Sequence, residues 1–291
     1  MTPRAALLSL HAAVLMFGLS GLIGKSVSSP AVVVTCLRSL IGAVALGILL
    51  WHVPRSRDLL SVFRGRSTAM LVGGALLACH WCTFFMAIQL GTVALGLLTY
   101  ASYPLFVTIL NWLLQRESVR GKDWLAAVAV LIGLGLVVPD WNFGSQAGLA
   151  SALGLVSGFT FALLTLLNRH LIRDVSPLPL VTVQMAIAGF VLLPLAAPQI
   201  FQVTVEDWFW LSLLGVVFTG IAHACFTSSL KTVRVAAVSV AAALEPVYGM
   251  LAAAIFLREM PTILMLIGAA FIIGASFISL LQAPQVENVK P

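Results

Sequence analysis

The sequence predicts an all-α integral membrane protein with ten transmembrane helices, arranged as two inverted five-helix repeats with both termini in the cytoplasm. Three observations lead to this fold class. Hydrophobic residues make up 60% of the 291 positions and charged residues only 9%, whereas roughly a quarter of the residues are charged in soluble domains. A stretch in the first half recurs in part in the second, and lysines and arginines gather in alternate loops. A chain with a mean hydropathy of +1.07 cannot cover its surface with polar groups in water.

Ten apolar segments are long enough, as helices, to cross the roughly 30 Å of hydrocarbon in a bilayer. They cover residues 5–24, 31–52, 68–89, 92–114, 122–139, 146–168, 178–197, 207–230, 235–257 and 261–281. The weakest separation lies between the third and fourth segments, where only Gln89, Gly91 and Thr92 interrupt apolar sequence. We interpret the first segment as an uncleaved helix and not as a signal peptide. The polar tail 284–291 is expected to be disordered.

The segment Val93–Glu117 recurs in part at Val235–Glu259, at an offset of 142 residues. Each copy opens with Val-Ala, carries a proline in its middle (Pro104 and Pro246) and closes with Arg-Glu. The proline precedes the glutamate by 13 residues in both copies. Only six of the 25 positions are identical, but prolines and charged residues are rare in the apolar segments. Their shared spacing therefore indicates an internal repeat.

Five spans in each half is an odd number, so the second half must enter the membrane from the opposite side. We therefore predict an inverted-topology repeat, with residues 1–143 as the first five-helix unit and residues 144–283 as the second. Many secondary transporters have this arrangement, and their substrate sites lie near the membrane midplane where the repeats meet. A fainter match at an offset of 144 residues pairs Phe17 with Phe161.

Positive charges distinguish the two sides of the membrane. Thirteen of the 16 lysines and arginines fall on the side of the N-terminus, only Lys25 and Arg258 fall on the other side, and Arg38 lies within the second span. Cytoplasmic loops carry the excess of Lys and Arg, so both termini are expected in the cytoplasm and the protein in the cell inner membrane. The same asymmetry accounts for the net charge of +6, and no nucleic-acid partner is expected.

The sequence lacks the signatures of enzymes, metal sites and cofactor sites. It contains no Gly-x4-Gly-Lys-Ser/Thr loop for ATP, and no Ser/His/Asp spacing stands out within the spans. The four cysteines lie in apolar stretches and are expected to be free, buried thiols. Cys79 and Cys82 form a single CxxC without a second pair of ligands for a metal. We expect no enzyme activity, no cofactor and no metal.

Ten spans in two inverted halves, with a proline followed 13 residues later by glutamate near the end of the fourth and ninth spans, resemble the EamA-type drug/metabolite transporter superfamily. The resemblance covers nearly the whole chain. Within it, the segment Ala75–Pro104, in which aromatic residues flank the proline, is similar to the YddG-type amino-acid exporters. The resemblance implies a bundle that exports amino acids or related metabolites through a central cavity between its halves.

Ionisable side chains inside hydrocarbon are costly, so each is a candidate for function. Glu245 precedes Pro246, which lacks an N–H and would leave a helix carbonyl free beside the carboxylate. Together they could receive an ammonium group or a proton; alternatively, Glu245 is protonated or holds helices together. Its counterpart in the first half is Tyr103. Arg38 could bind a substrate carboxylate, pair with Glu245 or extend towards the membrane surface.

His80 and His223 occupy nearly equivalent positions in the third and eighth spans and could carry a proton or donate a hydrogen bond to substrate. In the plainer alternative, each is neutral and bonded to nearby backbone. Tyr100, Tyr103 and Phe106 recur at helical spacing, which predicts a common partner for one face of the fourth span. The complete set of expected substrate-binding residues is Arg38, His80, Trp81, Phe84, Tyr100, Tyr103, His223, Phe226, Glu245 and Tyr248.

Three further features have structural interpretations. Pro104 and Pro246 are expected hinges. The Arg-Glu pairs are interpreted as anchors and helix end caps, with a gate closed by ion pairs as the alternative. Small residues in the fifth and tenth spans, such as Gly133 and Gly268, are expected to permit close helix approach.

We therefore expect a secondary transporter that exports amino acids, with a preference for apolar or aromatic ones, by alternating access around a site built by the third, fourth, eighth and ninth spans. A multidrug or other-metabolite exporter of the same fold is the main alternative. A membrane enzyme or scaffold without a transport path and an open channel are two further alternatives. The expected partners are a small-molecule substrate and the lipid bilayer, with the protein monomeric or weakly self-associating.

Overall fold

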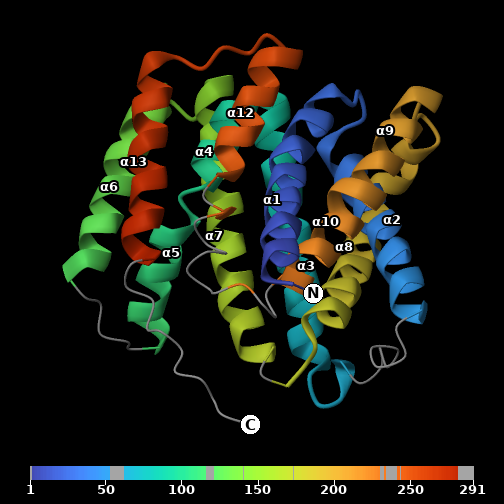
Figure 1. Cartoon of the computed structure of the whole chain (residues 1–291). Helices are drawn as coiled ribbons and strands as arrows, with labels where there is room; N and C mark the ends of the chain where they lie inside the picture. The colour runs from blue at the N-terminus through green and yellow to red at the C-terminus, as the bar shows by residue number, and fades with distance from the viewer. Residues whose placement is uncertain are drawn as a thin grey trace.

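The computed structural model describes residues 2–52, 62–115, 121–139, 141–172, 174–229, 233, 241–242 and 244–280, and every regular element in these ranges is a helix (Figure 1). In chain order the helices are α1 (Pro3–Ser26), α2 (Ala31–His52), α3 (Ser67–Leu90), α4 (Val93–Tyr100), α5 (Tyr103–Leu110), the π-helix η3 (Asn111–Gln115), α6 (Gly121–Val137), α7 (Gln146–Leu171), α8 (Pro177–Ile200), α9 (Val205–Gly215), the π-helix η4 (Val216–Ile221), α10 (Ala222–Ser229), α12 (Glu245–Phe256) and α13 (Ile263–Leu280). The pair Arg116-Glu117, residues 235–240 of the second repeat copy and the tail 284–291 lie outside the described residues.

The lengths and composition of these helices suit a bilayer. Seven helical segments are long and apolar enough to cross a membrane, namely Pro3–Ser26, Ala31–His52, Ser67–Leu90, Val93–Leu113, Gln146–Leu171, Pro177–Ile200 and Val205–Phe226. Three shorter apolar helices cover Trp124–Val137, Glu245–Phe256 and Ile263–Ala275. The prediction of an all-helical membrane fold is confirmed in this form, because the described chain consists of apolar helices joined by short connections.

Hydroxyl side chains begin several helices. Thr92, Ser145 and Thr204 stand directly before α4, α7 and α9, and the side-chain oxygen of each accepts a hydrogen bond from the backbone N–H three residues later. Such N–H groups in the first turn have no partner within the helix itself. Pro3 and Pro177 lie in the first turn of α1 and α8, where a missing N–H removes no helical bond.

Two of the expected spans are not continuous α-helices. The segment 92–114 breaks between α4 and α5, with Pro104 in the first turn of α5. Pro246 likewise lies in the first turn of α12. A proline in that position removes no hydrogen bond from its helix, so the expectation that Pro246 lies inside a continuous helix is corrected. In the segment 207–230, η4 separates α9 from α10.

The helices pack as a bundle with two large buried clusters. One cluster draws mainly on α2, α3, α8 and α9, and the other on α4, α6 and α13. Between them, α7 packs on α3, α4 and α5, whereas α1 packs on α10, η4 and α12. The pair α6 and α13 lies at the outside of the bundle (Figure 1). There a Cβ atom on Gly133 would lie 2.8 Å from the carbonyl oxygen of Gly268, which confirms the expected close approach.

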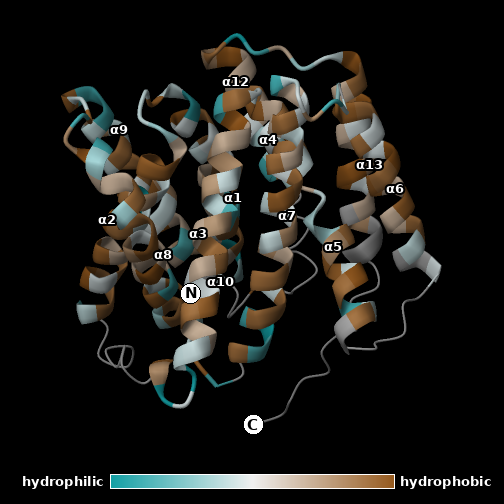
Figure 2. Ribbon diagram, turned by 180° about the vertical axis from the view of Figure 1, so that it is seen from behind, coloured by the Kyte–Doolittle hydropathy of each residue, from teal (hydrophilic) through white to brown (hydrophobic). Residues whose placement is uncertain are grey.

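The outer faces of the peripheral helices are apolar. Large exposed hydrophobic side chains include Ile48 on α2, Leu131 on α6, Phe190 on α8 and Ile267 on α13. Figure 2 shows hydrophobic ribbon along most of the outer helices, with many hydrophilic residues near the ends of the bundle. Soluble monomers rarely expose contiguous apolar surface of this extent. These faces are therefore suited to contact with lipid hydrocarbon.

Candidate functional site

His80 lies within α3, is only 5% exposed and faces α7. Its Nδ1 lies 2.8 Å from the hydroxyl oxygen and 3.1 Å from the carbonyl oxygen of Ser157, and the Ser157 hydroxyl donates to the carbonyl of His80. The centroid of its ring lies 4.8 Å from that of Phe161 and 5.2 Å from that of Tyr100. One ring nitrogen thus has a partner on α7, as in the plainer of the two interpretations.

Tyr100 and Tyr103 stand on either side of the break between α4 and α5. Their rings stack with centroids 5.7 Å apart. Both contact Phe161 of α7, at centroid distances of 5.5 and 5.1 Å, and Phe84 of α3 lies 5.5 Å from Tyr100. The predicted common partner of this segment is confirmed, and it is α7.

A second aromatic cluster surrounds His223 in α10. Its ring lies 4.9 Å from that of Phe17 in α1 and 6.1 Å from that of Trp81 in α3. Phe226, one turn later on α10, lies 5.8 Å from Phe17, and both Phe226 and Tyr248 of α12 pack against buried residues of α1. The first aromatic cluster, around His80 and Tyr100, joins α7, α3 and the α4–α5 segment. The second cluster joins α1, α10 and α12 in the same way.

Arg38 of α2 is 2% exposed, which excludes the alternative in which its guanidinium extends to the membrane surface. Its Cζ lies 4.3 Å from the ring centroid of Trp81 and 5.0 Å from that of Phe85. Its Nε donates a hydrogen bond of 3.1 Å to Oγ1 of Thr219 in η4. Among the described residues it forms no ion pair with Glu245 or any other carboxylate within 4.0 Å, so pairing with Glu245 is also excluded in this conformation.

Glu245 begins α12 and is half-buried beside α1. The two helices approach closely, because a Cβ atom on Gly18 would lie 2.7 Å from the carbonyl oxygen of Glu245. Within the described part of the chain, its carboxylate makes no hydrogen bond and no ion pair. It lies near enough to Arg38, Tyr100 and Tyr103 for electrostatic interaction with them.

The structure connects eight of the ten expected residues through ring and cation–ring contacts, with Phe17 and Phe85 completing the connections. Tyr248 packs on the α1 side of the second cluster, and Glu245 is related to Arg38, Tyr100 and Tyr103 only electrostatically. The structure also adds residues that sequence reasoning missed. Trp81 and Arg38 lie between the two aromatic clusters, and Arg38 lies near enough to both histidines for their charges to interact. Thr219 and Ser157 were missed because a single hydroxyl inside an apolar helix carries no sequence signal. Phe17 and Phe161 did leave one, namely their shared offset of 144 residues.

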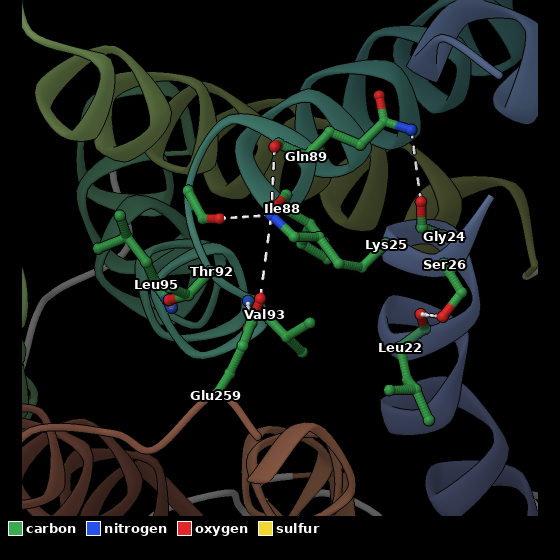
Figure 3. Close-up of polar contacts among 11 residues, drawn as sticks. Leu22, Gly24, Lys25, Ser26, Ile88, Gln89, Thr92, Val93, Leu95 and Glu259 are labelled. Carbon is green, nitrogen blue, oxygen red and sulfur yellow. Dashed lines mark hydrogen bonds and ion pairs between the residues drawn. The ribbon is translucent and has the colours of Figure 1, made fainter. Parts of the chain in front are cut away.

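A polar cluster joins several helices at the end of the bundle where α1 finishes. We call it the clasp, and it consists of Lys25, Gln89, Val93 and Glu259 (Figure 3). Lys25 Nζ donates to three carbonyl oxygens around the end of α3, at 2.6 to 3.2 Å, and lies 3.9 Å from Oε1 of Glu259. Oε2 of Glu259 accepts a hydrogen bond of 2.8 Å from the backbone N–H of Val93. Gln89 Nε2 donates to two carbonyl oxygens next to the end of α1, at 3.0 and 3.3 Å.

The clasp follows the electrostatics of helix ends. A cation is stabilised at the carbonyl end of a helix and an anion at its N–H end, and Lys25 and Glu259 occupy these places on α3 and α4. Glu259 thus caps the start of α4, as in the end-cap interpretation, and it is also paired with Lys25, as the alternative of an ion-pair gate requires. The neighbouring Arg258 has a positive φ of 58°, a conformation that is uncommon for residues other than glycine.

A surface pocket of about 500 Å³ lies elsewhere, between the start of α3 and the end of α7. Its rim carries an ion pair of 2.8 Å between Arg66 and Asp174. None of the expected substrate-binding residues lines it. Among the described cysteines Cys36 is buried but Cys79 is exposed, which corrects the expectation that all four thiols are buried. In the same part of the chain, no three His, Cys, Asp or Glu side chains are placed to hold a metal ion.

The model of the EamA-like transporter family matches residues 4–138 and again residues 148–281. The chain belongs to the EamA-like transporter family. This family lies within the drug/metabolite transporter superfamily that the sequence resembles. It identifies the protein as a multi-pass membrane transporter and not an enzyme, with a small molecule as its substrate and the bilayer as its surroundings.

Individual relatives agree with this family. The EamA-like chain is 28% identical over 197 residues to an uncharacterized transporter of Archaeoglobus fulgidus, covering 68% of this chain and 70% of the relative. It is 27% identical over 228 residues to the uncharacterized transporter YwfM of Bacillus subtilis, covering 77% and 75%. It is 27% identical over 234 residues to the protein RarD of Salmonella typhi, covering 77% and 74%. A crystal structure with 20% identity superposes with a TM-score of 0.67, covering 99% of this chain and 100% of the other, and it shows the likeness of fold alone.

Proposed function

We propose that this EamA-like transporter exports amino acids, with a preference for apolar or aromatic ones, across the inner membrane by alternating access. The observation that carries the proposal is the carboxylate of Glu245, which lies near the stacked Tyr100 and Tyr103 without a hydrogen bond or ion pair in the described part of the chain. An ionised group in this environment is costly unless it is paired. An ammonium group on an apolar molecule supplies the charge, and the surrounding rings accept the rest of that molecule.

The proposed transporter has ten spans in two inverted five-helix units, residues 1–143 and 144–283, with both termini in the cytoplasm. The two separate matches to one family model support this division. Helix packing supports it as well. In the proposed repeat, α1 corresponds to α7, α3 to α10, and the α4–α5 segment to α12. The contacts of α7 with α3, α4 and α5 then correspond to those of α1 with α10 and α12. The helices α2 and α8 are counterparts and pack on each other, and so do α6 and α13.

The two aromatic clusters are the proposed walls of the substrate site. His80, Phe84, Tyr100 and Tyr103 would contact the substrate from one side. Trp81, His223, Phe226, Glu245 and Tyr248 would contact it from the other. Because each cluster joins helices from both proposed halves, movement of one half against the other would change the shape of the site.

Alternating access needs one end of the site to close while the other opens. The clasp ties α1, α3, α4 and the connection between α12 and α13 together at one end, so we propose that the clasp breaks when the site opens to the outside. Pro104 and Pro246 begin the helices next to the site, and we propose the preceding breaks as the hinges. We further propose that the protein is monomeric or only weakly self-associating.

A counterflow assay tests the proposed function. The purified protein is placed in liposomes loaded with unlabelled amino acid, and uptake of each labelled amino acid is measured against protein-free liposomes. We expect accumulation of one or more apolar or aromatic amino acids and none of acidic ones. The alternative, a multidrug exporter of the same fold, predicts flux of lipophilic cations instead. Absence of flux for the whole amino-acid panel would contradict the proposal.

A further inference from the structure

The guanidinium of Arg38 is surrounded by aromatic rings inside the bundle. The side chain is 2% exposed, and its Cζ lies 4.3 Å above the ring of Trp81 and 5.0 Å from that of Phe85. Ring faces attract the positive charge without using its N–H groups. The rings therefore explain how the cation is tolerated here, but they accept none of the hydrogen bonds that its N–H groups can donate.

Only one donor of Arg38 has a partner in the described part of the chain. Nε donates to Oγ1 of Thr219, which itself donates to the carbonyl oxygen of Leu214, five residues earlier. Thr219 lies in η4, so the π-helix carries the oxygen that Arg38 reaches. A guanidinium has five N–H donors in a rigid fork. Its two terminal nitrogens form no hydrogen bond with any described residue.

No carboxylate among the described residues pairs with Arg38. Glu245 interacts with Arg38 electrostatically but is not within 4.0 Å of it. The Nδ1 atoms of His80 and His223 face oxygens of Ser157 and Thr219. A buried charge that served only to hold helices together would be paired, since an unpaired one is strongly destabilising. The two terminal nitrogens of a guanidinium form a planar fork that can bind a carboxylate through two parallel hydrogen bonds.

We propose that Arg38 binds the carboxylate of the transported substrate through its two terminal nitrogens, while Glu245 receives the ammonium group of the same molecule. The inference rests on the proposed function and deepens it, because it assigns the carboxylate and the ammonium group of the amino acid to two particular residues. Thr219 is a positioning residue, since it accepts the hydrogen bond from Nε and thereby orients the two terminal nitrogens of Arg38. Trp81 contributes the ring on which the guanidinium lies.

Three probes, each with a phenyl group, distinguish the contribution of the substrate carboxylate from that of the ammonium group. Phenylalanine carries both charges, 2-phenylethylamine lacks the carboxylate and 3-phenylpropionate lacks the ammonium group. In the unaltered protein, we expect each single-charge probe to compete at least about tenfold more weakly than phenylalanine, because a lost charge-assisted hydrogen bond weakens affinity by roughly one decade or more. Equal competition by 2-phenylethylamine overturns the proposal without any variant.

Two variants of Arg38 assign the carboxylate to this residue. Arg38→Gln is expected to lose the advantage of phenylalanine over 2-phenylethylamine while keeping the affinity for the amine. Arg38→Lys keeps the charge but not the fork, so it is expected to retain only part of that advantage. Arg66→Gln, which removes an arginine at the surface pocket, is the matched control and should leave the ratio unchanged. An unchanged ratio in Arg38→Gln overturns the proposal.

The outcomes distinguish this inference from the proposed function. If Arg38→Gln does not fold, two other measurements test the proposal. They are the ratio of the affinities for phenylalanine and 2-phenylethylamine in Arg38→Lys, and the competition by the three probes in the unaltered protein. If no amino acid is transported but 3-phenylpropionate stabilises the protein thermally in an Arg38-dependent manner, the amino-acid function fails and the carboxylate site stands. If amino acids are transported with the same affinity as their amines, the function stands and the carboxylate site is overturned.

Discussion

The ring of Phe17 in α1 lies 4.9 Å from that of His223 in α10. The ring of Phe161 in α7 lies 4.8 Å from that of His80 in α3. The two phenylalanines are 144 residues apart and the two histidines 143. Near-equal spacing in the sequence has thus become a near-equal contact in space, at two places where a helix of one half of the chain meets a helix of the other.

This correspondence predicts matched effects of two substitutions. Phe17→Ala and Phe161→Ala each remove a half-buried ring that joins two helices. Each is expected to destabilise the protein by roughly 1–3 kcal/mol, less than for a fully buried ring. Thermal unfolding in detergent measures the effect, with Phe209→Ala, which removes an exposed ring of α9, as the control. A large loss in only one of the two variants would show that the contacts are not equivalent.

Glu245→Gln should separate charge from packing. The amide keeps the size of the side chain at the start of α12, so thermal stability is expected to change little. The initial rate of amino-acid counterflow should fall at least about tenfold, because a charge-assisted bond to the substrate ammonium is lost. Glu206→Gln, at an exposed carboxylate in α9, is the control. Undiminished counterflow in Glu245→Gln would remove the main support for the proposed site.

Breaking the clasp should favour opening at its end of the bundle. Lys25→Met leaves three carbonyl oxygens and one side of Glu259 without their cation. Spin labels at Ser26 and Met260, both exposed near the clasp, are expected to report longer distances in this variant, in a background without native cysteines. Lys25→Arg, which retains the cation, serves as the comparison. Identical distance distributions in the methionine variant and the parent would argue that the clasp does not control opening.

The α6–α13 contact allows a test within one helix. At Gly133 a Cβ atom would lie 2.6 Å from Ile272 Cγ1 and 2.8 Å from the carbonyl oxygen of Gly268. At Gly135 a Cβ atom would meet nothing within 4 Å. Gly133→Ala is therefore expected to cost roughly 1–3 kcal/mol through overpacking, whereas Gly135→Ala should be neutral or slightly stabilising. Thermal unfolding of the two variants side by side measures the difference.

The sequence by itself determined the class of molecule and most of the helix boundaries. Hydrophobic content and segment length decide whether a chain enters a bilayer, and both are additive along the chain. The segment 31–52 matches α2 at both ends. Helix starts also depend on local residues, such as the hydroxyl caps at Thr92 before α4 and at Thr204 before α9. The sequence also predicted the family, because prolines and charged residues are rare in an apolar chain and their repeated spacing can be recognised.

Only the tertiary structure decided which partner each buried polar group meets. Arg38 had three possible fates in the sequence, and the packing of α2 against η4 and α3 excluded two of them. Likewise, Lys25 and Glu259 meet although 234 residues separate them. Such contacts depend on how helices far apart in the chain are placed, and periodicity along one helix does not contain that information. Composition and spacing thus predicted a membrane transporter, whereas the placement of Arg38 and Glu245 came from the fold.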